Sequence, residues 1–383
     1  MEESIRGKAL RIGIITWFYY ENYGTRLQAL ALQHYLRDLG HTAELINFVP
    51  PESRVKGYRP RQKLSEKIDS RILRRYRQKA ARDFTAQIRE KSEKLDASLR
   101  RLCLLSEPAE DDESFIRICN SYDLLICGSD QIWNPYWFHR YYYADFPEIL
   151  TPKISYSPSI GIDVTDAAQA DRIREAVGKF AALSVREKGS ADWLSSLTGR
   201  PVACTADPVL LLRASEWDAL LKLEDTAEEP YAAVYFLSDS RRHWRAAEKF
   251  CTGKGLKAVV IPAQGRSYYE RGTIAADAGV EDFVRILRNA EYVITDSYHA
   301  SLFSVIYEKQ FRVFERFRPD SESSQNRRID DFAEMLGLQS CLLRYGTDSL
   351  DFAEPIPYGK VRALKRAGIE ESVQYLQKAV QCR

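Results

Sequence analysis

Three polar side chains, Asp296, Ser297 and His299, follow a short apolar run in the last third of the chain. The run, 292–295, is rich in β-branched and aromatic residues, which is typical of a buried parallel strand. Ligands of open α/β sheets bind beyond the carboxyl ends of the strands, where helix N-termini direct free N–H groups at anions. An imidazole beside a carboxylate and hydroxyls at such an edge could transfer a proton to or from an anionic substrate. Alternatively, Asp296 or Ser297 only caps the next helix and His299 is structural.

The sequence around this motif predicts a parallel α/β unit in the second half of the chain. Apolar periodicity predicts a helix that includes 302–306, and 311–314 predicts the next strand. Earlier strands and helices are predicted at 231–237, 241–251, 257–261 and 279–290. The polar turn 323–328 precedes a predicted helix at 329–336. Its Asn326, Arg327 and Arg328 are placed to contact an anion at the start of that helix.

A polar turn made of Asn22, Tyr23 and Gly24 lies inside a predicted βαβ unit at the start of the chain. Strand 11–17 precedes the turn, and helix 25–39 and strand 42–48 follow it. Nucleotide-binding folds hold phosphates at this place, although GxGxxG is absent from the chain. Arg26 and Gln28 on the first helical turn are hydrogen-bond donors for an anionic ligand. The alternative is that Gly24 permits a tight turn and Asn22 bonds the local backbone.

A second polar turn follows the predicted strand 123–127. It contains Ser129, Asp130, Gln131, Trp133 and Asn134, and the aromatic stretch 136–143 after it includes His139. An indole ring can cover the apolar face of a sugar while carboxylate and amide groups bind the sugar hydroxyls. These residues are therefore candidates for a hydroxyl-rich ligand. The alternative is a core tryptophan beside a capped turn.

Arg186 is predicted at the carboxyl end of the strand 182–187. The strand 153–159 and the helix 166–180 precede it. A guanidinium group binds carboxylates and phosphates through two parallel hydrogen bonds, so Arg186 could hold an anionic substrate. The alternative is a salt bridge with Glu187 or another neighbour.

The composition is that of a soluble globular protein with room for two domains. The chain has 383 residues and a formal net charge of +2, which gives no global signal for nucleic acid. Seven cysteines are scattered without a CxxC pair, so neither a disulfide framework nor a zinc cluster is expected. No apolar run is long enough to cross a bilayer, and 1–8 is charged rather than apolar. We expect a cytoplasmic protein that can still contact a membrane face.

The segment 54–101 is strongly basic. It contains 17 Lys and Arg against 6 Asp and Glu, a local net charge of +11, and two helices are predicted in it. A run of this kind can be a solvated helical face. It can also bind anionic lipid headgroups or a diphosphate-bearing lipid, because each basic residue near such a surface contributes about 1 kcal/mol. No aromatic platform or nucleic-acid motif accompanies the charge.

Seven short motifs, in their order along the chain, resemble the polysaccharide pyruvyl transferase family. They are Asn22-Tyr23-Gly24 with Leu27-Gln28-Ala29 and Ala31-Leu32, Gly128-Ser129-Asp130-Gln131 with Trp133-Asn134, Ser155-Tyr156-Ser157-Pro158-Ser159, Ser184-Val185-Arg186-Glu187, Asp207-Pro208-Val209-Leu210-Leu211 with Trp217, Asp296-Ser297 with His299, and Arg328-Ile329 with Leu336-Gly337-Leu338. The chain departs from the family pattern at Tyr298-His299-Ala300, where the family often has Phe-His-Gly, and at Ser157, where it commonly has alanine. Both changes concern the choice of acceptor more than the chemistry.

The resemblance implies an α/β protein with two Rossmann-like domains that face each other across a cleft, as in GT-B glycosyltransferases. We expect a first domain at 1–215, on the acceptor side, with the basic helical insertion 54–105. The second domain, on the donor side, is expected at 216–357, and a C-terminal helix, 358–383, is expected to pack back toward the first domain.

The implied reaction transfers pyruvate from phosphoenolpyruvate to sugar hydroxyls as a ketal, on the repeat unit of a surface or exopolysaccharide. The implied acceptor is a glycan that can be linked to undecaprenyl diphosphate, and neither a further cofactor, a metal nor nucleic acid is expected. His299 would be the general acid and base, with Asp296 orienting it and Arg186 binding the donor. The implied donor-binding residues are Arg186, Ser297, Asn326, Arg327 and Arg328. The implied acceptor-binding residues are Asn22, Tyr23, Gly24, Arg26, Gln28, Ser129, Asp130, Gln131, Trp133, Asn134 and His139.

Two other functions fit the same residues. A nucleotide-sugar glycosyltransferase can be built on the same architecture, because function is determined by the site rather than the fold. A non-catalytic carbohydrate-binding protein of a glycan assembly complex is the second. Phosphate released from phosphoenolpyruvate would indicate pyruvyl transfer, and nucleoside diphosphate released from a sugar donor would indicate a glycosyltransferase. Sugar binding without consumption of either donor would indicate the binding protein.

Overall fold

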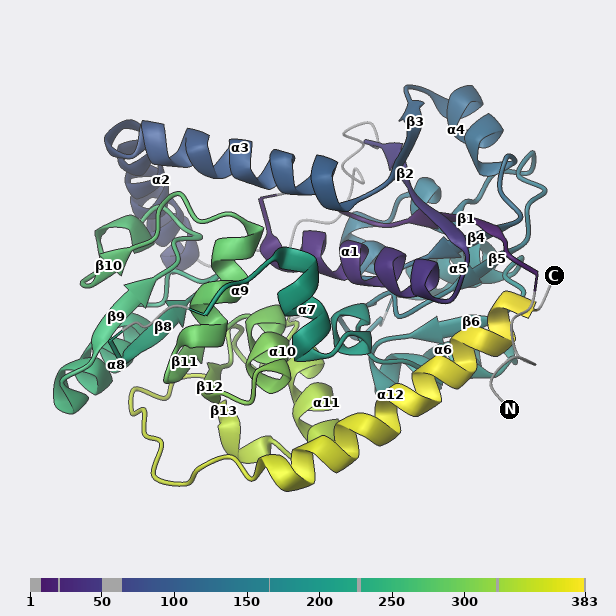
Figure 1. The fold of residues 1–383 in the computed structure, drawn as a ribbon. Helices are drawn as coiled ribbons and strands as arrows, with labels where there is room; N and C mark the ends of the chain where they lie inside the picture. Colours follow the sequence, from purple (N-terminus) through teal and green to yellow (C-terminus); the bar gives the residue numbers. More distant parts are fainter. Residues whose placement is uncertain are drawn as a thin grey trace. The chain divides into compact units, whose positions relative to one another are not determined.

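The computed structural model describes residues 8–19, 21–49, 64–164, 166–225, 229–321 and 324–381. Residues 54–63 of the basic segment and the charged start of the chain, 1–7, lie outside the described residues. The chain divides into two compact units, each with its own parallel sheet (Figure 1). The first unit comprises Met1–Tyr58, Leu102–Leu212 and Lys365–Arg383, and the second comprises Arg59–Arg101 and Arg213–Leu364.

The first unit is built on a five-stranded parallel sheet with the order β3-β2-β1-β4-β5. Its strands are β1 (Arg11–Ile15), β2 (Thr42–Phe48), β3 (Leu105–Ala109), β4 (Leu124–Cys127) and β5 (Lys153–Ser155). A separate parallel pair is formed by β6 (Leu183–Val185) and β7 (Val202–Cys204). The strand order reverses between β1 and β4, since β2 and β3 lie on one side and β5 on the other. Ligands of open α/β sheets bind at such a switch point.

Four longer helices belong to the first unit: α1 (Tyr23–Asp38), α4 (Asp112–Cys119), α5 (Ala167–Val177) and α6 (Lys188–Thr198). Helix α1 begins at Tyr23, two residues before the predicted start, and its N-cap Asn22 accepts a side-chain hydrogen bond from the Gly24 backbone N–H. Side chains on all sides of its N-terminal half are buried, so the helix is enclosed rather than laid on the surface. This burial brings the residues of its first turns to the carboxyl edge of the sheet.

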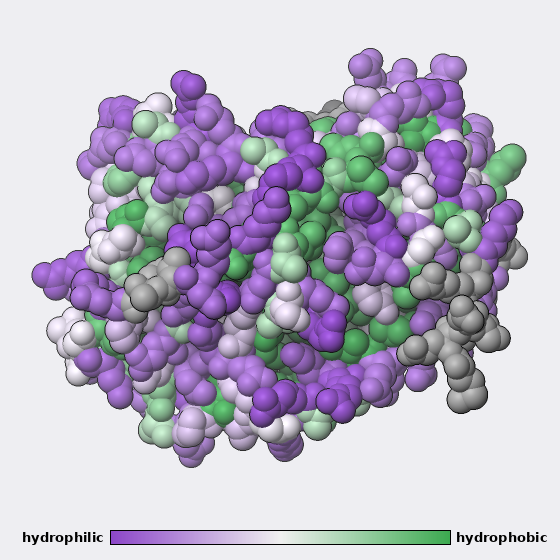
Figure 2. Space-filling view, in the orientation of Figure 1, coloured by the Kyte–Doolittle hydropathy of each residue, from purple (hydrophilic) through white to green (hydrophobic). Residues whose placement is uncertain are grey.

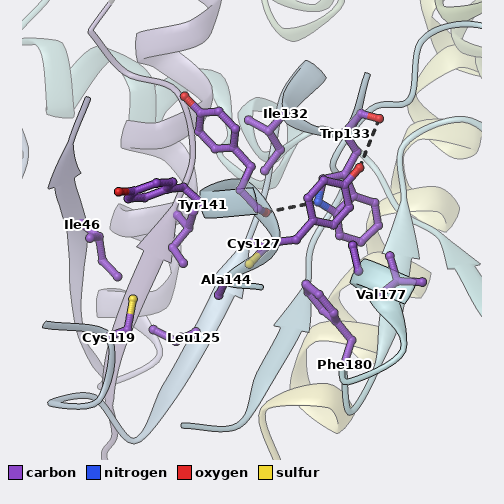
Figure 3. Close-up of a cluster of buried hydrophobic side chains, with 14 of the residues drawn as sticks. Ile46, Cys119, Leu125, Cys127, Ile132, Trp133, Tyr141, Ala144, Val177 and Phe180 are labelled. Atoms are coloured by element: carbon purple, nitrogen blue, oxygen red, sulfur yellow. Dashed lines mark hydrogen bonds between the residues drawn. The ribbon is translucent and has the colours of Figure 1, made fainter. Parts of the chain in front are cut away.

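Helices α4 and α5 border a hydrophobic core cluster that extends from the end of β4 to the aromatic stretch 136–146 (Figure 3). Trp133 lies in this cluster and stacks on Tyr143 with ring centroids 5.1 Å apart. Phe180 meets the same indole edge to face at 5.5 Å. The Trp133 Nε1–H donates to the Tyr142 carbonyl at 3.3 Å, so its one polar atom is satisfied inside the core.

The second unit has a six-stranded parallel sheet with the order β10-β9-β8-β11-β12-β13. Its strands are β8 (Tyr231–Tyr235), β9 (Lys257–Val260), β10 (Thr273–Ile274), β11 (Tyr292–Thr295), β12 (Gln310–Phe314) and β13 (Leu342–Leu343). The order reverses between β8 and β11. The two-residue edge strands β10 and β13 were not predicted, because so short a run has no periodicity to read.

Helices α7 (Ala214–Leu221), α8 (Arg241–Lys254), α9 (Val280–Asn289), α10 (Tyr298–Ile306) and α11 (Arg327–Leu336) belong to the second unit. The most amphipathic, α9, buries Val280, Phe283, Val284, Ile286 and Leu287. Helix α10 is buried over its whole length. It therefore holds the motif Asp296-Ser297-x-His299 rigidly at the end of β11.

The basic helices α2 (Leu64–Asp83) and α3 (Thr85–Leu102) group with the second unit up to Arg101, which differs from the domain division expected from the sequence. Side-chain contacts explain the difference. Phe84, between the two helices, packs on Tyr268 with ring centroids 5.0 Å apart. On α3, Lys94 pairs with Asp277, and the Ser98 hydroxyl donates to Glu281 at 2.7 Å. Sequence position alone had placed this insertion with the first domain.

The long C-terminal helix α12 (Tyr358–Gln381) contributes to both units. Its Tyr358 hydroxyl donates to the Ser304 carbonyl at 3.2 Å in the second unit. In the first unit, the Tyr375 hydroxyl donates to the Ser155 carbonyl at 2.8 Å. Hydrophilic residues dominate the visible surface where Figure 1 shows α3 and α12 (Figure 2). In the described part of the chain, no helix is both long and apolar enough to cross a membrane.

Candidate active site

The switch point of the first sheet, between β1 and β4, is filled by a hydrogen-bond network. The Gln28 side-chain N–H group donates to Thr16 Oγ1 at 3.0 Å, and its carbonyl accepts from the Ser129 backbone N–H at 3.1 Å. Thr25 Oγ1 donates to Asp130 Oδ2 at 2.8 Å. Gln28 and Ser129 are fully buried, so they join α1 to the two strands instead of facing a ligand.

Gly128 precedes this network at the end of β4 and has a φ of +139°. A Cβ atom placed there would lie 2.0 Å from the Tyr156 carbonyl oxygen. Only glycine therefore allows β4 and the segment after β5 to approach each other this closely. The sequence predicted the turn, and this close approach is the physical reason for its glycine.

Arg186, at the end of β6, is enclosed in the same network. Its Nη2 donates to Ser129 Oγ at 2.6 Å and lies 3.1 Å from Asp207 Oδ2, and its Nη1 is 3.9 Å from Asp130 Oδ1. The side chains of Arg186 and Asp207 are 2% and 0% exposed. Arg186 thus forms a buried salt bridge, which was the alternative considered from the sequence, and its partner is Asp207. Glu187 instead accepts a hydrogen bond from the Ser159 hydroxyl.

The N-terminal turn of α1 is mostly buried as well. Arg26 is buried and donates from Nη2 to the Tyr19 carbonyl at 3.0 Å. Tyr23 and Gly24 are buried, whereas Asn22 is exposed. Of the residues predicted here for a ligand, Asn22 is thus the one that solvent reaches most freely.

The turn after β4 has a structural role. Trp133 is a core residue, as the alternative reading proposed, and it is not available to stack on a sugar. Asn134 is fully buried, and its side-chain oxygen accepts a hydrogen bond from the Tyr136 backbone N–H at 3.0 Å. Gln131 is also buried. His139 is half-buried beside Tyr141, at 5.0 Å between ring centroids, and burial lowers the pKa of its imidazole.

In the second unit, Asp296 lies at the switch point between β8 and β11. Its Oδ1 accepts from the Leu237 backbone N–H at 2.6 Å, and its Oδ2 accepts from the Ser238 N–H at 3.0 Å. The Nδ1 atom of His243 lies 3.8 Å from Asp296 Oδ2. Asp296 therefore fixes the loop after β8, while its implied role of orienting His299 stays a prediction.

Ser297 and His299 begin α10. The Ser297 hydroxyl accepts a hydrogen bond from the Ala300 backbone N–H at 3.4 Å, which is the capping role of the alternative reading. His299 is the second residue of the helix and is 7% exposed. Its ring stands at 85° to that of Tyr298, with centroids 5.4 Å apart. The imidazole thus lies at the positive end of the α10 dipole.

Arg328, from the start of α11, lies on the same tyrosine. Its guanidinium carbon is 5.6 Å from the centroid of the Tyr298 ring, and its Nη2 donates to Gln325 Oε1 at 3.3 Å. Tyr298 therefore contacts both Arg328 and His299. A guanidinium group, an imidazole and a helix N-terminus gathered around one ring form an electropositive site suited to an anion.

Asn326 and Arg327, the two residues before Arg328, have different surroundings in the structure. The Asn326 side chain bonds both backbone groups of Phe317, accepting from its N–H at 3.1 Å and donating to its carbonyl at 2.7 Å. It thus holds the loop after β12. Arg327 is exposed.

The structure adds two residues at the ligand edge of the second sheet. The Asp239 side chain follows β8, and its Oδ1 is buried without a hydrogen-bond partner among the described residues. Burial raises the pKa of Asp239 to about 6. Arg316 follows β12, and its guanidinium lies 4.9 Å from the Phe317 ring centroid. Their position directly after predicted strands was the available signal, but neither belongs to a recognisable motif.

Within the described residues, no group of three or more His, Cys, Asp or Glu side chains is arranged to hold a metal ion. The six cysteines described there form no disulfide.

Comparison with solved structures identifies the fold. Arabidopsis thaliana UGT89C1 complexed with UDP-L-rhamnose superposes with a TM-score of 0.50 at 13% identity, over 98% of this chain and 100% of that chain. Staphylococcus aureus MnaA in a co-structure with UDP gives 0.49 at 11% identity, over 96% and 90%. The glycosyltransferase SnogD from Streptomyces nogalater gives 0.43 at 13% identity, over 98% of each chain. The first of these confirms the expected GT-B-like α/β fold and bears on the fold alone.

A search of curated proteins gives no significant match. The family model for polysaccharide pyruvyl transferase matches residues 22–316, well over half of the chain. The matched region begins at the Asn22 turn and ends at Arg316, so it includes the second switch point and the Asp296-Ser297-x-His299 motif. The chain belongs to the polysaccharide pyruvyl transferase family.

Proposed function

We propose that this protein transfers pyruvate from phosphoenolpyruvate to two hydroxyls of a glycan, forming a cyclic ketal. The observation that carries the proposal is the placement of His299 and Arg328 around Tyr298 at the N-terminus of α10. Phosphoenolpyruvate carries a carboxylate and a phosphate, and this site offers a cation and a positive helix end for them. It also offers an imidazole, the side chain that most often serves as a general acid and base in enzymes.

The reaction balances without an oxidant or a reductant. The methylene carbon of the enol gains a proton and becomes a methyl group, and a sugar hydroxyl adds to the neighbouring carbon. The bond from that carbon to the phosphate oxygen then breaks, and a second hydroxyl closes the ketal ring. One of the two hydroxyl protons is thereby accounted for by the methyl group, and the other leaves with inorganic phosphate.

In this scheme His299 is the general acid and base. Proton transfer by a placed side chain contributes roughly 10²–10⁴ to the rate. Arg328 and the positive end of the α10 dipole attract the anionic donor. Arg186 is already neutralised by Asp207, so we assign it a positioning role: it holds the Ser129 hydroxyl and the Asp130 carboxylate in place. Asp296 likewise positions the loop after β8.

For the acceptor we infer a lipid-diphosphate-linked glycan at the inner, cytoplasmic face of a membrane, with α2 as a peripheral contact. Leu73, Tyr76 and Ala80, three and four residues apart, form the inner side of α2, and the Tyr76 ring lies 6.1 Å from that of Tyr269. Arg74, Arg75 and Arg82 are exposed. Helical geometry places these three side chains on one outward face, which suits anionic headgroups.

The decisive experiment supplies phosphoenolpyruvate with a panel of undecaprenyl-diphosphate-linked glycans and follows both phosphate release and product mass. We expect phosphate release that depends on the glycan, with the product heavier by one pyruvate ketal. Release of a nucleoside diphosphate from a sugar nucleotide, with no consumption of phosphoenolpyruvate, would instead establish a glycosyltransferase. Glycan binding with neither donor consumed would establish a non-catalytic binding protein.

A further inference from the structure

Trp137 is unusual among the tryptophans because nearly half of its surface is exposed. Its relative exposure is 47%, whereas Trp133 and Trp217 are fully buried and Trp244 is 5% exposed. Burial of an indole removes a large apolar area from water, so a folded protein rarely leaves one at the surface without a ligand for it. Isolated exposed apolar residues are common, however, and the exposure needs support from the surroundings of Trp137.

Those surroundings hold Trp137 in place. Its ring centroid lies 6.1 Å from that of Trp17 with an interplanar angle of 70°, and Trp17 meets Tyr142 at 5.8 Å and 82°. In an edge-to-face pair, at most one ring face is covered by the partner. The contact between Trp17 and Trp137 therefore fixes two indoles and still leaves ring faces uncovered by that contact.

The backbone that carries Trp137 is also fixed. Asn134 accepts from the Tyr136 N–H through its side chain and from the Trp137 N–H through its carbonyl at 3.0 Å. Pro135 between them is buried. This explains why Asn134 is fully buried: it shapes the turn that presents Trp137. A preorganised aromatic side chain loses little conformational freedom when a ligand binds.

Trp17 joins this aromatic pair to the network at the first switch point. Its carbonyl accepts a hydrogen bond from Gln28 Nε2 at 3.0 Å. The same amide group donates to Thr16, and the Gln28 carbonyl accepts from Ser129. Trp17 follows β1 by two residues, so the pair lies at the carboxyl edge of the sheet, where ligands bind.

We propose that Trp17 and Trp137 form a stacking platform for a neutral pyranose ring of the acceptor glycan. The axial C–H groups on one face of a pyranose are apolar and pack on an indole, while the hydroxyls point outward and remain available for reaction. This inference rests on the proposed function and deepens it, because it names the kind of sugar ring that residues of the first unit would bind. Trp133, which the sequence favoured for this role, is core, and Trp137 takes its place four residues later.

Binding of sugars without any donor tests the platform. The probes are the methyl pyranosides of glucose, galactose, mannose and N-acetylglucosamine, followed by saturation-transfer NMR on the wild-type protein, Trp137→Ala and Tyr345→Ala. Tyr345 is an equally exposed aromatic residue of the second unit, at 44%, and serves as the matched control. We expect at least one pyranoside to bind through one ring face, and Trp137→Ala to weaken its binding by roughly tenfold. Tyr345→Ala should leave it unchanged.

Three results would overturn the platform: no pyranoside binds the wild type, Trp137→Ala binds as well as the wild type, or Tyr345→Ala weakens binding equally. Because nearly half of Trp137 is exposed, Trp137→Ala should unfold only slightly below the wild-type temperature, and a melting curve checks this. If Trp137→Ala nevertheless unfolds early, Trp137→Phe keeps an aromatic ring in place and should retain part of the binding. Full loss with Trp137→Phe in a folded protein would also contradict stacking.

The same variants separate this proposal from the proposed function. If pyranosides bind through Trp137 but phosphoenolpyruvate is never consumed, the platform stands and the pyruvyl transfer does not. If pyruvyl transfer proceeds and Trp137→Ala leaves the KM for the glycan unchanged, the platform fails and the function stands. With both correct, Trp137→Ala raises the KM for the glycan and leaves the KM for phosphoenolpyruvate unchanged.

Discussion

The carboxylate of Asp296 lies 3.8 Å from Nδ1 of His243, and both of its oxygens accept hydrogen bonds from the backbone after β8. Asp296 directly follows β11, and His243 lies in the first turn of α8. Asp296, which follows β11, thus holds the backbone that follows β8 by two hydrogen bonds.

Asp296→Asn should destabilise the fold. A hydrogen bond to a charged group contributes about 1.5–3 kcal/mol, and the amide can replace only one of the two acceptor oxygens. Thermal unfolding followed by circular dichroism should show a clear fall in Tm. Ser297→Ala is the matched comparison in the next position, where the loss of a helix cap costs about 0.5–2 kcal/mol. An Asp296→Asn protein as stable as the wild type would contradict a stabilising role for the hydrogen bonds that Asp296 accepts from Leu237 and Ser238.

His299→Gln should remove activity while leaving stability nearly unchanged. The general acid and base is lost, so turnover with phosphoenolpyruvate should fall by roughly 10²–10⁴. Phosphate release measures the rate, and the melting curve reports on the fold. His34→Gln, a partly exposed histidine on α1 paired with Asp38 and remote in sequence from the motif, is the control and should turn over normally. Near-normal turnover in folded His299→Gln would reject the catalytic assignment.

The ion pair between Arg186 and Asp207 should behave as a buried structural pair. Asp207→Leu alone leaves a guanidinium group buried beside an apolar side chain, which typically costs about 3–5 kcal/mol. The double variant Asp207→Leu with Arg186→Met removes both charges and should recover much of that loss. Unfolding in urea measures the four free energies of the cycle.

The double variant also tests the function of Arg186. If Arg186 only positions Ser129 and Asp130, the refolded double variant should show an altered KM for the glycan with an unchanged KM for phosphoenolpyruvate. A KM for phosphoenolpyruvate that rises instead would restore Arg186 to the donor-binding role that the resemblance implied. No coupling in the stability cycle would mean that the pair is not energetically a unit.

The sheets and the edges that carry the site could be predicted, because buried parallel strands are continuous apolar runs. The strands around 11–17, 123–127 and 292–295 were found in this way, and the residues after them lie at the switch points as expected. Burial of individual side chains could not be predicted. Trp133 and Trp137 stand four residues apart in one aromatic stretch, and only the packing on Tyr143 shows that the first is core.

The sequence also could not predict which residues these polar side chains contact. Arg186 is bonded to Asp207, which stands on a separate turn, and Asp296 is bonded to the backbone at the end of β8. The helices α2 and α3 group with the second unit through Phe84 and Lys94, although they interrupt the first in sequence. Each of these contacts joins residues far apart in the chain, where local periodicity and motif spacing carry no information.

The pH dependence of stability should carry the signature of Asp239. Burial, with a further contribution from Glu270 and Asp296, raises its pKa from the ordinary 3.8 to about 6, while Arg266 acts in the opposite direction. Because the folded-state pKa lies above the unfolded value, the folded protein binds this proton more tightly. The contribution is fully present below the unfolded pKa and is lost as the pH rises through the folded pKa.

Asp239→Asn removes that titration. We expect the Tm of Asp239→Asn, relative to the wild type, to rise between the ordinary pKa of 3.8 and the folded pKa of about 6 and to level off above it. Scanning calorimetry across this range makes the measurement. Asp348→Asn, an exposed carboxylate, is the control and should show no such trend. A constant Tm difference across the range would rule out the raised pKa.

The outward face of α2 should bind anionic lipid. Arg74, Arg75 and Arg82 are exposed, and each basic residue near an anionic surface contributes about 1 kcal/mol. The triple variant to glutamine should therefore release the protein from vesicles of phosphatidylglycerol and phosphatidylcholine in a sedimentation assay. The matched control replaces Arg241, Arg245 and Lys249, three exposed basic residues four apart on α8 of the same unit. Both triple variants change the net charge equally, so a loss confined to the α2 variant assigns the binding to that face. Equal loss in both would indicate nonspecific charge attraction, and no loss in either would leave α2 as a solvated helix.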